Sequence, residues 1–308
     1  MLISQAEWEK SFGGYYRGDV AFNASMKEHT SLALGGPADV VVSPEDPVSL
    51  KNIVMLLGRL KVPFLPLGGG TNILVRDAGI EGVVIKFKAF NRIEIIDETD
   101  EQVELFVDAG VLLQKLVNFC REKGYAGMEG FIGIPGMVGG AICGNAGSYG
   151  CEIRELLISV VVLRPDGTLE RFRPEDLGFG YRRSGIPADD IVLNATLKFR
   201  IDDAAAVAAR TEGFFNQKKT AQPIWEKSAG CVFRNPENMS AGKMIDEAGC
   251  KGMRIGDIEV SAIHANFFVN CGEGRAEDYL TLMDEVSAKV RERFHVVLEP
   301  EIRVVGKG

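Results

Sequence analysis

The chain has 308 residues, of which 46% are hydrophobic and 25% are charged, and its net charge is −8. This composition is ordinary for a globular protein of about two domains. The negative charge disfavours a general nucleic-acid binder, and no apolar run of about 18 residues is present to span a membrane. Acidic residues interrupt the N-terminal stretch where a signal peptide needs an apolar core, so we expect a cytoplasmic protein.

The predicted elements alternate strands and helices along the first 200 residues. Strands are expected at 38–44, 62–67, 82–87, 102–109, 156–163 and 190–200, with helices at 47–60 and 111–124. A helix at 204–219 marks the passage to a second domain, which has an amphipathic helix at 275–294 and ends on a strand at 302–305. The pattern indicates an α+β fold with a boundary near residue 200.

Metal chemistry is not expected. The six cysteines and three histidines show neither a C-x-x-C nor an H-E-x-x-H spacing. In a reducing compartment each cysteine is by default a buried thiol.

A first glycine loop reads L-P-L-G-G-G-T-N-I-L-V over residues 65–75. Three successive glycines allow a ligand close to the backbone and can form an anion-binding nest. The loop lacks the lysine of a P-loop, and it precedes a strand rather than the helix of a dinucleotide fingerprint. Phosphate contact is favoured over a simple tight turn.

A second stretch, residues 124–150, holds ten glycines among 27 residues. The residues between them are bulky and apolar, which excludes collagen and a flexible linker. We expect a closely packed loop whose backbone lines a flat cofactor, and a flavin nucleotide suits it.

The segment K-S-A-G-C-V-F-R-N-P (227–236) raises a question about Cys231, which is either a small core side chain or a reactive thiol. It lies within residues 218–254, where seven Lys/Arg outnumber four Asp/Glu. That excess predicts either a solvated basic face or a pocket for an anionic ligand.

Seven motifs together resemble the UDP-N-acetylenolpyruvoylglucosamine reductase family, in its shorter class, over nearly the whole chain. They are the two glycine stretches, Y-R-R-S (181–184), A-G-C-V-F-R-N-P, A-G-K-M-I-D-E-A-G-C-K-G (241–252), H-A-N-F-F-V-N (264–270) and L-E-P-E-I-R (298–303). The resemblance implies an FAD-binding region of the vanillyl-alcohol-oxidase (PCMH) type over 1–201, with subdomains of about 1–88 and 89–201. A C-terminal α+β substrate-binding domain would cover 202–308, and its last strand can return to the FAD region.

The implied reaction belongs to peptidoglycan precursor synthesis. NADPH would reduce non-covalent FAD, and the reduced flavin would pass a hydride to UDP-N-acetylglucosamine enolpyruvate, giving UDP-N-acetylmuramate. By the resemblance, Arg182 holds the substrate carboxylate, Glu301 is its carboxylate partner and Cys231 is the proton donor. The physical chemistry agrees, because hydride addition leaves an enolate-like carboxylate that a fixed cation stabilises and a carbon that needs a proton.

The remaining site residues also follow from the matched motifs. The implied substrate ligands are Lys219 at the diphosphate, Asn235 at the sugar nucleotide, and Tyr181 and Asn266. The cofactor-binding residues are expected in the two glycine stretches: Gly68, Gly69, Gly70, Thr71, Asn72, Ile134, Pro135, Gly139, Gly140, Gly144, Asn145, Ala146 and Gly147. The family commonly has serine where this chain has Cys231.

Two other functions share some of these features. Another FAD oxidoreductase of the same fold, such as a hydroxy-acid oxidase, would keep the glycine stretches but has no need of Lys219 and Asn235. A non-catalytic flavin or nucleotide-sugar module would tolerate loss of Cys231 or Arg182. A monomer without membrane or nucleic-acid partners is expected, although the sequence does not determine the oligomeric state, the choice of NADPH over NADH, or the ligands of the uridine.

Overall fold

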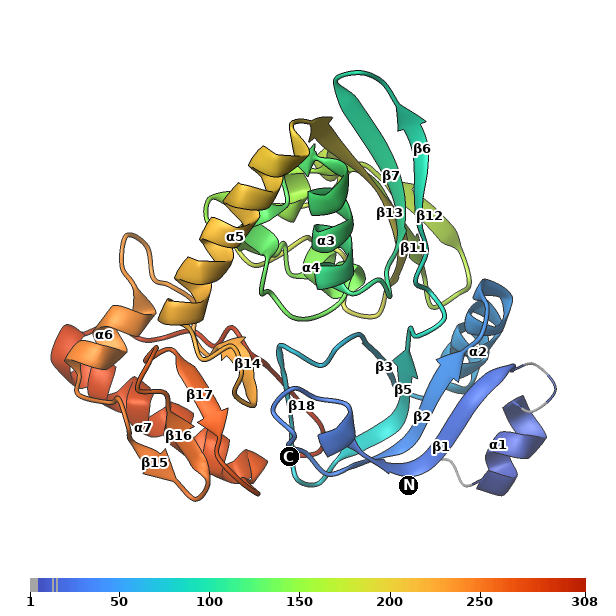
Figure 1. Ribbon diagram of the computed structural model, residues 1–308. Helices are drawn as coiled ribbons and strands as arrows, with labels where there is room; N and C mark the ends of the chain where they lie inside the picture. The colour runs from blue at the N-terminus through green and yellow to red at the C-terminus, as the bar shows by residue number, and fades with distance from the viewer. Residues whose placement is uncertain (1–4, 13, 15) are drawn as a thin grey trace. The chain divides into compact units, whose positions relative to one another are not determined.

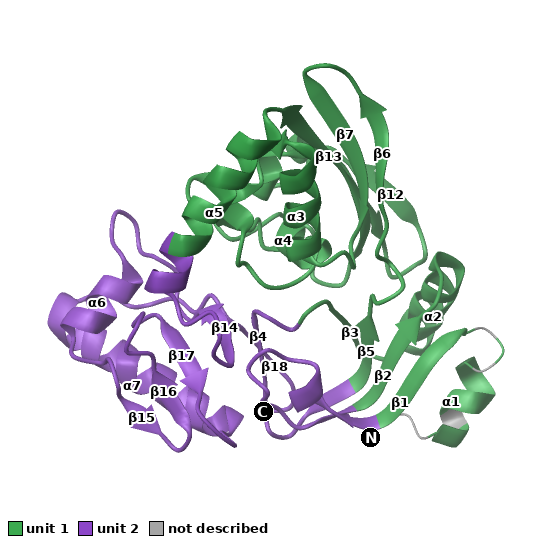
Figure 2. Cartoon of the chain, in the orientation of Figure 1, with its two compact units in different colours: residues 1–22, 39–69, 82–216 green, residues 23–38, 70–81, 217–308 purple. Residues whose placement is uncertain are grey.

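The structure, a computed structural model, describes residues 5–12, 14 and 16–308. Residues 1–4 belong to the stretch predicted not to be a signal peptide and lie outside the described residues. The chain forms two compact units (Figure 2): unit 1 comprises residues 1–22, 39–69 and 82–216, and unit 2 comprises residues 23–38, 70–81 and 217–308. The last change of unit falls inside helix α5 (Ala204–Ala221). No described helix has the length and apolar character needed to cross a membrane.

The first sheet has the strand order β1-β2-β5-β3 and packs against helices α1 and α2 (Figure 1). Helix α2 begins where Asp46 accepts a 2.6 Å hydrogen bond from the Ser49 backbone and Pro47 takes the first turn. It ends at Lys61 in the left-handed conformation. The elements are α1 (Gln5–Phe12), β1 (Gly18–Ser25), β2 (Pro37–Pro44), α2 (Pro47–Leu60), β3 (Phe64–Leu67) and β5 (Ile80–Lys86).

The second sheet of unit 1 is antiparallel and has the order β12-β11-β13-β7-β6. Apolar side chains of α3 and α4 join those of the sheet in one buried cluster. The predicted strands at 102–109, 156–163 and 190–200 are confirmed to within one residue at each end. The elements are β6 (Ile93–Glu98), β7 (Gln102–Asp108), α3 (Leu113–Lys123), β8 (Tyr125–Ala126), α4 (Val138–Cys143), β11 (Leu157–Leu163), β12 (Leu169–Phe172) and β13 (Ile191–Ile201).

The second glycine stretch is more regular than the predicted loop, because it contains α4 and a 3₁₀ turn at Glu129–Phe131. Close backbone packing allows this. The Gly139 N–H donates to the Ala109 carbonyl at 2.8 Å, and a Cβ at Gly139 would lie 2.8 Å from the Ala109 Cβ. The glycine therefore lets the helix start directly against the sheet.

Unit 2 contains a four-stranded sheet of order β14-β17-β16-β15 that packs with α6 and α7 around a separate apolar cluster. The last strand, β18, pairs in parallel with β4 from the N-terminal part of the chain. The elements are β4 (Ile73–Val75), β14 (Ser228–Cys231), α6 (Ala241–Glu247), β15 (Arg254–Ile255), β16 (Ile258–Val260), β17 (Phe267–Asn270), α7 (Ala276–Phe294) and β18 (Arg303–Val305).

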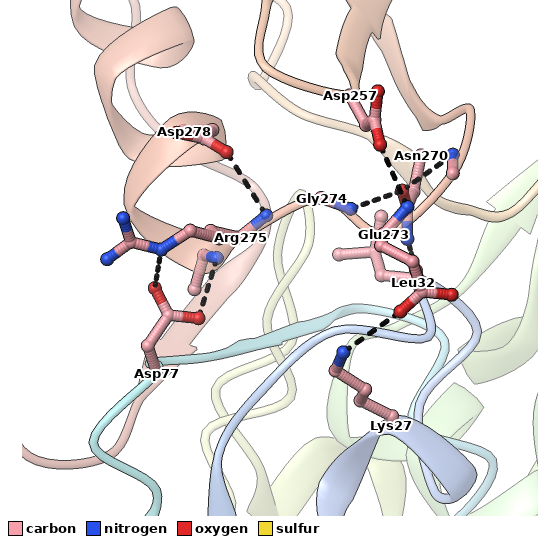
Figure 3. A network of polar contacts seen from close by, with 11 residues as sticks. Lys27, Leu32, Asp77, Asp257, Asn270, Glu273, Gly274, Arg275 and Asp278 are labelled. Atoms are coloured by element: carbon pink, nitrogen blue, oxygen red, sulfur yellow. Dashed lines mark hydrogen bonds and ion pairs between the residues drawn. The ribbon is translucent and has the colours of Figure 1, made fainter.

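A polar network explains why two N-terminal segments belong to unit 2 (Figure 3). The Asp77 carboxylate accepts hydrogen bonds from the backbone of Ala276 and Glu277 at the start of α7, at 3.0 and 3.1 Å. The Asn270 amide donates to the Leu32 carbonyl at 2.9 Å. A carboxylate at a helix N-terminus satisfies N–H groups that have no partner within the helix.

Candidate active site

The expected site residues fall on both units. Unit 1 holds Tyr181, Arg182, Gly68 and Gly69 and the whole second glycine stretch. Unit 2 holds Cys231, Glu301 and the expected substrate ligands, together with the end of the first glycine loop, Gly70–Asn72.

The two glycine stretches meet within unit 1. A Cβ at Gly68 would stand 3.4 Å from the Met137 side chain, which is ordinary contact distance. Leu112 and Met137 form an antiparallel bridge that brings the second stretch to the start of α3. The Gln114 amide then donates to the carbonyls of Phe131 and Ile134, at 3.1 and 2.8 Å, which fixes the loop carrying Ile134 and Pro135.

The glycines differ in what packing requires of them. At Gly70 the backbone has φ of +64°, and a Cβ would lie 2.2 Å from the His29 carbonyl oxygen, so the fold itself demands glycine. At exposed Gly140, inside α4, a Cβ would meet nothing within 4 Å. Glycine in a helix interior costs about 1 kcal/mol relative to alanine. A residue kept at that cost without a packing reason fits a surface that a flat cofactor approaches closely.

Arg182 sits in a strained turn at the edge of unit 1. Its backbone has φ of +55°, which is unfavourable for a side chain with a Cβ. One guanidinium N–H donates to the Gly147 carbonyl at 3.3 Å, and the guanidinium carbon lies 5.4 Å from the centre of the Tyr181 ring. Arg182 is therefore held against the end of the second glycine stretch, as a cation fixed beside backbone expected to bind the cofactor.

Asn145 links this turn to the glycine stretch. Its side chain is 1% exposed, and its Nδ2 donates at 3.0 Å both to the Glu152 carboxylate and to the Gly180 carbonyl. Its Oδ1 accepts from the Arg154 backbone at 3.4 Å. The side chain expected to bind the cofactor is thus committed to protein partners, and Gly180 is two residues before Arg182.

An ion pair braces the glycine stretch from α5. The Arg210 guanidinium donates to buried Glu129 at 3.0 Å and contacts Asp202 at 2.7 Å. Glu129 also accepts from the Gly127 backbone at 2.7 Å. Glu129 is the one acid within residues 124–150, and no local pattern in the sequence links it to Arg210, which lies about 80 residues further along the chain.

In unit 2 the structure brings two of the three predicted catalytic residues onto adjacent segments. Cys231 ends β14 and is half-buried. The Glu301 N–H donates to the carbonyl of the next residue, Val232, at 2.8 Å, and Phe233 bridges Pro300 in antiparallel fashion. The Asn72 amide donates to the Glu301 carbonyl at 3.2 Å, so the end of the first glycine loop also reaches this pair.

Asn266 holds the segment that follows Cys231. It is 2% exposed; its Oδ1 accepts from the Phe233 N–H at 2.9 Å, and its Nδ2 donates to the Phe233 carbonyl at 2.7 Å. Its own carbonyl accepts from the Val232 N–H at 2.8 Å. The expected substrate ligand therefore uses its side chain on the backbone beside the thiol.

Apolar side chains surround the protein side of Cys231. Val232 and Phe233 are buried, and so is Tyr279 of α7. Burial first, and then the negative charge that Cys231 would carry as a thiolate, raise the pKa of the Tyr279 hydroxyl far above its usual range. Val232, Phe233 and Tyr279 thus belong to one apolar cluster of unit 2.

Two expected substrate ligands of unit 2, Lys219 and Asn235, are exposed. Lys219 is exposed in the last turn of α5, and exposed Asn235 accepts a 3.0 Å hydrogen bond from the Ala241 backbone at the start of α6. The neighbouring Lys218 is buried, and burial lowers the pKa of its ammonium to about 8. The basic excess of 218–254 is thus divided between surface and interior.

Comparisons with known proteins give matches along nearly the whole chain. Residues 38–173 match the FAD binding domain family, and residues 222–305 match the family described as UDP-N-acetylenolpyruvoylglucosamine reductase, C-terminal domain. The fold class predicted from the sequence is confirmed in this division.

Individual relatives match at similar lengths. The chain is 40% identical to the UDP-N-acetylenolpyruvoylglucosamine reductase of Geotalea uraniireducens (strain Rf4), over 94% of this chain and 95% of that protein. The enzyme of the same name from Rubrobacter xylanophilus is 41% identical over 93% of this chain and 95% of that protein. The crystal structure of the Thermus caldophilus reductase superposes with a TM-score of 0.79 at 36% identity, covering 94% of this chain and 99% of that one.

Proposed function

Because the chain belongs to the UDP-N-acetylenolpyruvoylglucosamine reductase family, we propose that it is the flavin-dependent oxidoreductase that forms UDP-N-acetylmuramate for peptidoglycan synthesis. Bound FAD would supply the hydride, taken from NADPH, that adds to the enolpyruvyl group. Residues 1–201 would hold the cofactor, and residues 202–308 would bind the UDP-sugar. The enzyme is proposed to act as a cytoplasmic monomer.

The two glycine stretches fit the cofactor. The first glycine loop offers backbone N–H groups to the diphosphate, with Gly68, Gly69, Gly70, Thr71 and Asn72 as the proposed contacts. The second stretch offers a side-chain-free surface around exposed Gly140. In this proposal Asn145 contributes through its backbone, because its side chain is committed to protein partners.

Three side chains are proposed to carry the chemistry. Arg182, fixed by Gly147 and Tyr181, would stabilise the negative charge that develops on the substrate carboxylate. Cys231 would give its proton to the carbon opposite the hydride, with Glu301 next to it. The observation that supports the proposal is that Cys231 and Glu301, far apart in sequence, lie on adjacent segments, which the 2.8 Å backbone hydrogen bond from Glu301 to Val232 joins.

Substrate binding is assigned to the surface of unit 2. Lys219 would contact the UDP diphosphate, and Asn235, oriented by its hydrogen bond to Ala241, would contact the sugar nucleotide. Tyr181 would contribute from unit 1. Asn266 would act indirectly, through the Phe233 backbone. A hydroxy-acid oxidase of related fold would have no use for Lys219 and Asn235.

An anaerobic half-reaction tests the proposal. The protein-bound flavin is reduced with NADPH, excess nucleotide is removed, and UDP-N-acetylglucosamine enolpyruvate is added while the flavin absorbance is followed. Reoxidation that produces UDP-N-acetylmuramate is the expected result. A flavin that stays reduced with this substrate, but reacts with a 2-hydroxy-acid oxidation product, would favour the oxidase. A protein that never takes electrons from NADPH would favour a binding module.

A further inference from the structure

A buried lysine ends strand β5 next to the first glycine loop. The strand reads I-E-G-V-V-I-K, and Lys86 interrupts an apolar run that is otherwise buried. Lys86 is 6% exposed, and it pairs in the parallel sheet with Leu67, the residue just before the three glycines. Its Nζ donates a 2.7 Å hydrogen bond to the Gly68 carbonyl.

The charge of Lys86 is poorly compensated by the protein. In the described part of the chain no carboxylate forms an ion pair with it, and the one charged side chain whose field affects it is the exposed Lys88, another cation. Burial first, and then Lys88, lower the pKa of Lys86 to about 8. An ammonium has three donors and is costly to bury without a counter-ion, so methionine would fill this position with less penalty.

The lysine binds a backbone carbonyl of the loop, which is a group that repels anions. A glycine loop binds phosphate through its N–H groups, while a carbonyl turned towards the phosphate repels it. The hydrogen bond from Nζ holds the Gly68 carbonyl to the lysine, and the same ammonium adds a positive charge beside the loop. An anionic ligand would provide the missing counter-charge.

We propose that Lys86 is a cofactor-binding residue, the buried cation that orders the first glycine loop for the FAD diphosphate. The inference rests on the proposed placement of FAD at this loop. It differs from a purely structural pin, which would hold the loop equally well without a charge and would strengthen the protein in the absence of cofactor.

Affinity and stability together separate these roles. FAD is removed, and its dissociation constant for the apoprotein is measured by quenching of flavin fluorescence for wild type, Lys86→Met, Lys86→Gln and the control Lys88→Gln. We expect Lys86→Met to weaken FAD binding by about tenfold to a hundredfold, as for loss of a hydrogen bond to a charged group. Lys88→Gln removes the same charge from an exposed position and should change the constant by less than about threefold.

Lys86→Met should weaken FAD binding without lowering the melting temperature of the apoprotein. Because the folded state holds the Lys86 proton less tightly than the unfolded chain, the charge destabilises the apoprotein at pH 7. Lys86→Met should therefore melt at the wild-type temperature or above it while binding FAD worse. A structural pin predicts a lower melting temperature instead.

Lys86→Gln keeps a shorter amide donor without the charge, and it carries the test if Lys86→Met does not fold. FAD affinity within about threefold of wild type in Lys86→Gln would overturn the inference, as would a parallel loss of melting temperature and affinity that Lys86→Gln restores. The titration uses no UDP-sugar. A wild type that binds FAD but fails the half-reaction would contradict the proposed function and leave Lys86 unaffected, whereas a wild type that binds no FAD would contradict both.

Discussion

Two buried asparagines, one in each unit, hold backbone near proposed catalytic residues, and they do so in different ways. Asn145 is 1% exposed and Asn266 is 2% exposed, and each is close in sequence or space to a proposed catalytic residue. Asn266 gives its acceptor and donor to the N–H and carbonyl of one residue, Phe233, as a neighbouring strand would. Asn145 instead contacts three different residues: it donates to the Glu152 carboxylate and the Gly180 carbonyl, and it accepts from the Arg154 N–H.

The two backbone segments therefore depend on their asparagines to different degrees. The segment after Cys231 keeps other backbone hydrogen bonds, from Val232 to the Asn266 carbonyl and from Glu301 to the Val232 carbonyl, both at 2.8 Å. The turn carrying Arg182 has a left-handed φ and lies in irregular backbone, where Gly180 and Arg183 form an isolated bridge. Activity should therefore depend more on Asn145 than on Asn266.

The largest loss of activity is expected on replacing Cys231, the proposed proton donor. The losses expected for the two asparagine variants are compared with it. Cys231→Ala removes the proposed proton donor while the backbone around it is retained, so we expect a loss of about 10²–10⁴-fold in the step that ends in protonation. Flavin reduction by NADPH should survive, as stopped-flow absorbance of each half-reaction would show. Cys231→Ser keeps a donor and should retain substantial activity. Full turnover by the alanine variant would return Cys231 to the role of a core side chain.

Asn145→Ala should give the second-largest effect. The Gly180 carbonyl and the Arg154 N–H lose their partner and the strained turn relaxes, so we expect kcat for the UDP-sugar reaction to fall about tenfold to a hundredfold. Loss of these two part-buried hydrogen bonds should also lower the free energy of unfolding, by about 1–3 kcal/mol in total.

Glu152→Gln is the matched control, because the glutamine still offers an oxygen to the Asn145 amide. It should stay within about threefold of wild type in kcat, since the ion pair between Arg154 and Glu152 is partly exposed. Equal losses in both variants would mean that the carboxylate, rather than the link to Gly180, holds Arg182.

The sequence selected both asparagines, and the structure adds the protein partners of their side chains. Strand and helix periods locate most elements of the two large sheets, because burial on one face leaves a local signature in the sequence. The motifs also select Asn145 and Asn266, as expected contacts of the cofactor and the substrate. The partners of an asparagine are set by tertiary contacts, such as that between Phe233 and Asn266, and no local pattern records them.

For Lys86, by contrast, the sequence indicated neither a site nor a role. A lysine within G-V-V-I-K-F breaks the apolar run, but strand propensity gives it no role. The parallel pairing of β3 with β5 is what places it beside Gly68. The helix in the second glycine stretch was missed for a related reason, since glycine content argues against α4 and only packing against Ala109 explains it.

Asn266→Ala should lower the stability of the protein much more than its activity. It leaves the buried N–H and carbonyl of Phe233 without their side-chain partner, so we expect the free energy of unfolding to fall by about 2–4 kcal/mol in denaturant titrations. At temperatures well below melting, kcat should fall only a few-fold, because the backbone pairing of Glu301 with Val232 persists. Asn266→Asp, which retains the acceptor for the Phe233 N–H, should lose less stability. A larger loss of kcat than in Asn145→Ala would reverse the comparison.

The smallest effect on stability is expected at Tyr279, whose buried side chain, unlike that of Asn266, is not hydrogen-bonded to any described residue. The side chain is fully buried on α7, and in the described part of the chain its hydroxyl has no hydrogen-bond partner. A buried hydroxyl without a partner is a net cost, so Tyr279→Phe should leave the free energy of unfolding unchanged or raise it by up to about 1 kcal/mol. The ring contact with Phe268, at 5.4 Å between centroids, is preserved. A loss of more than about 1 kcal/mol in denaturant titrations would mean that the hydroxyl is hydrogen-bonded in solution. Tyr279 and Asn266 would then both stabilise the fold through side-chain hydrogen bonds.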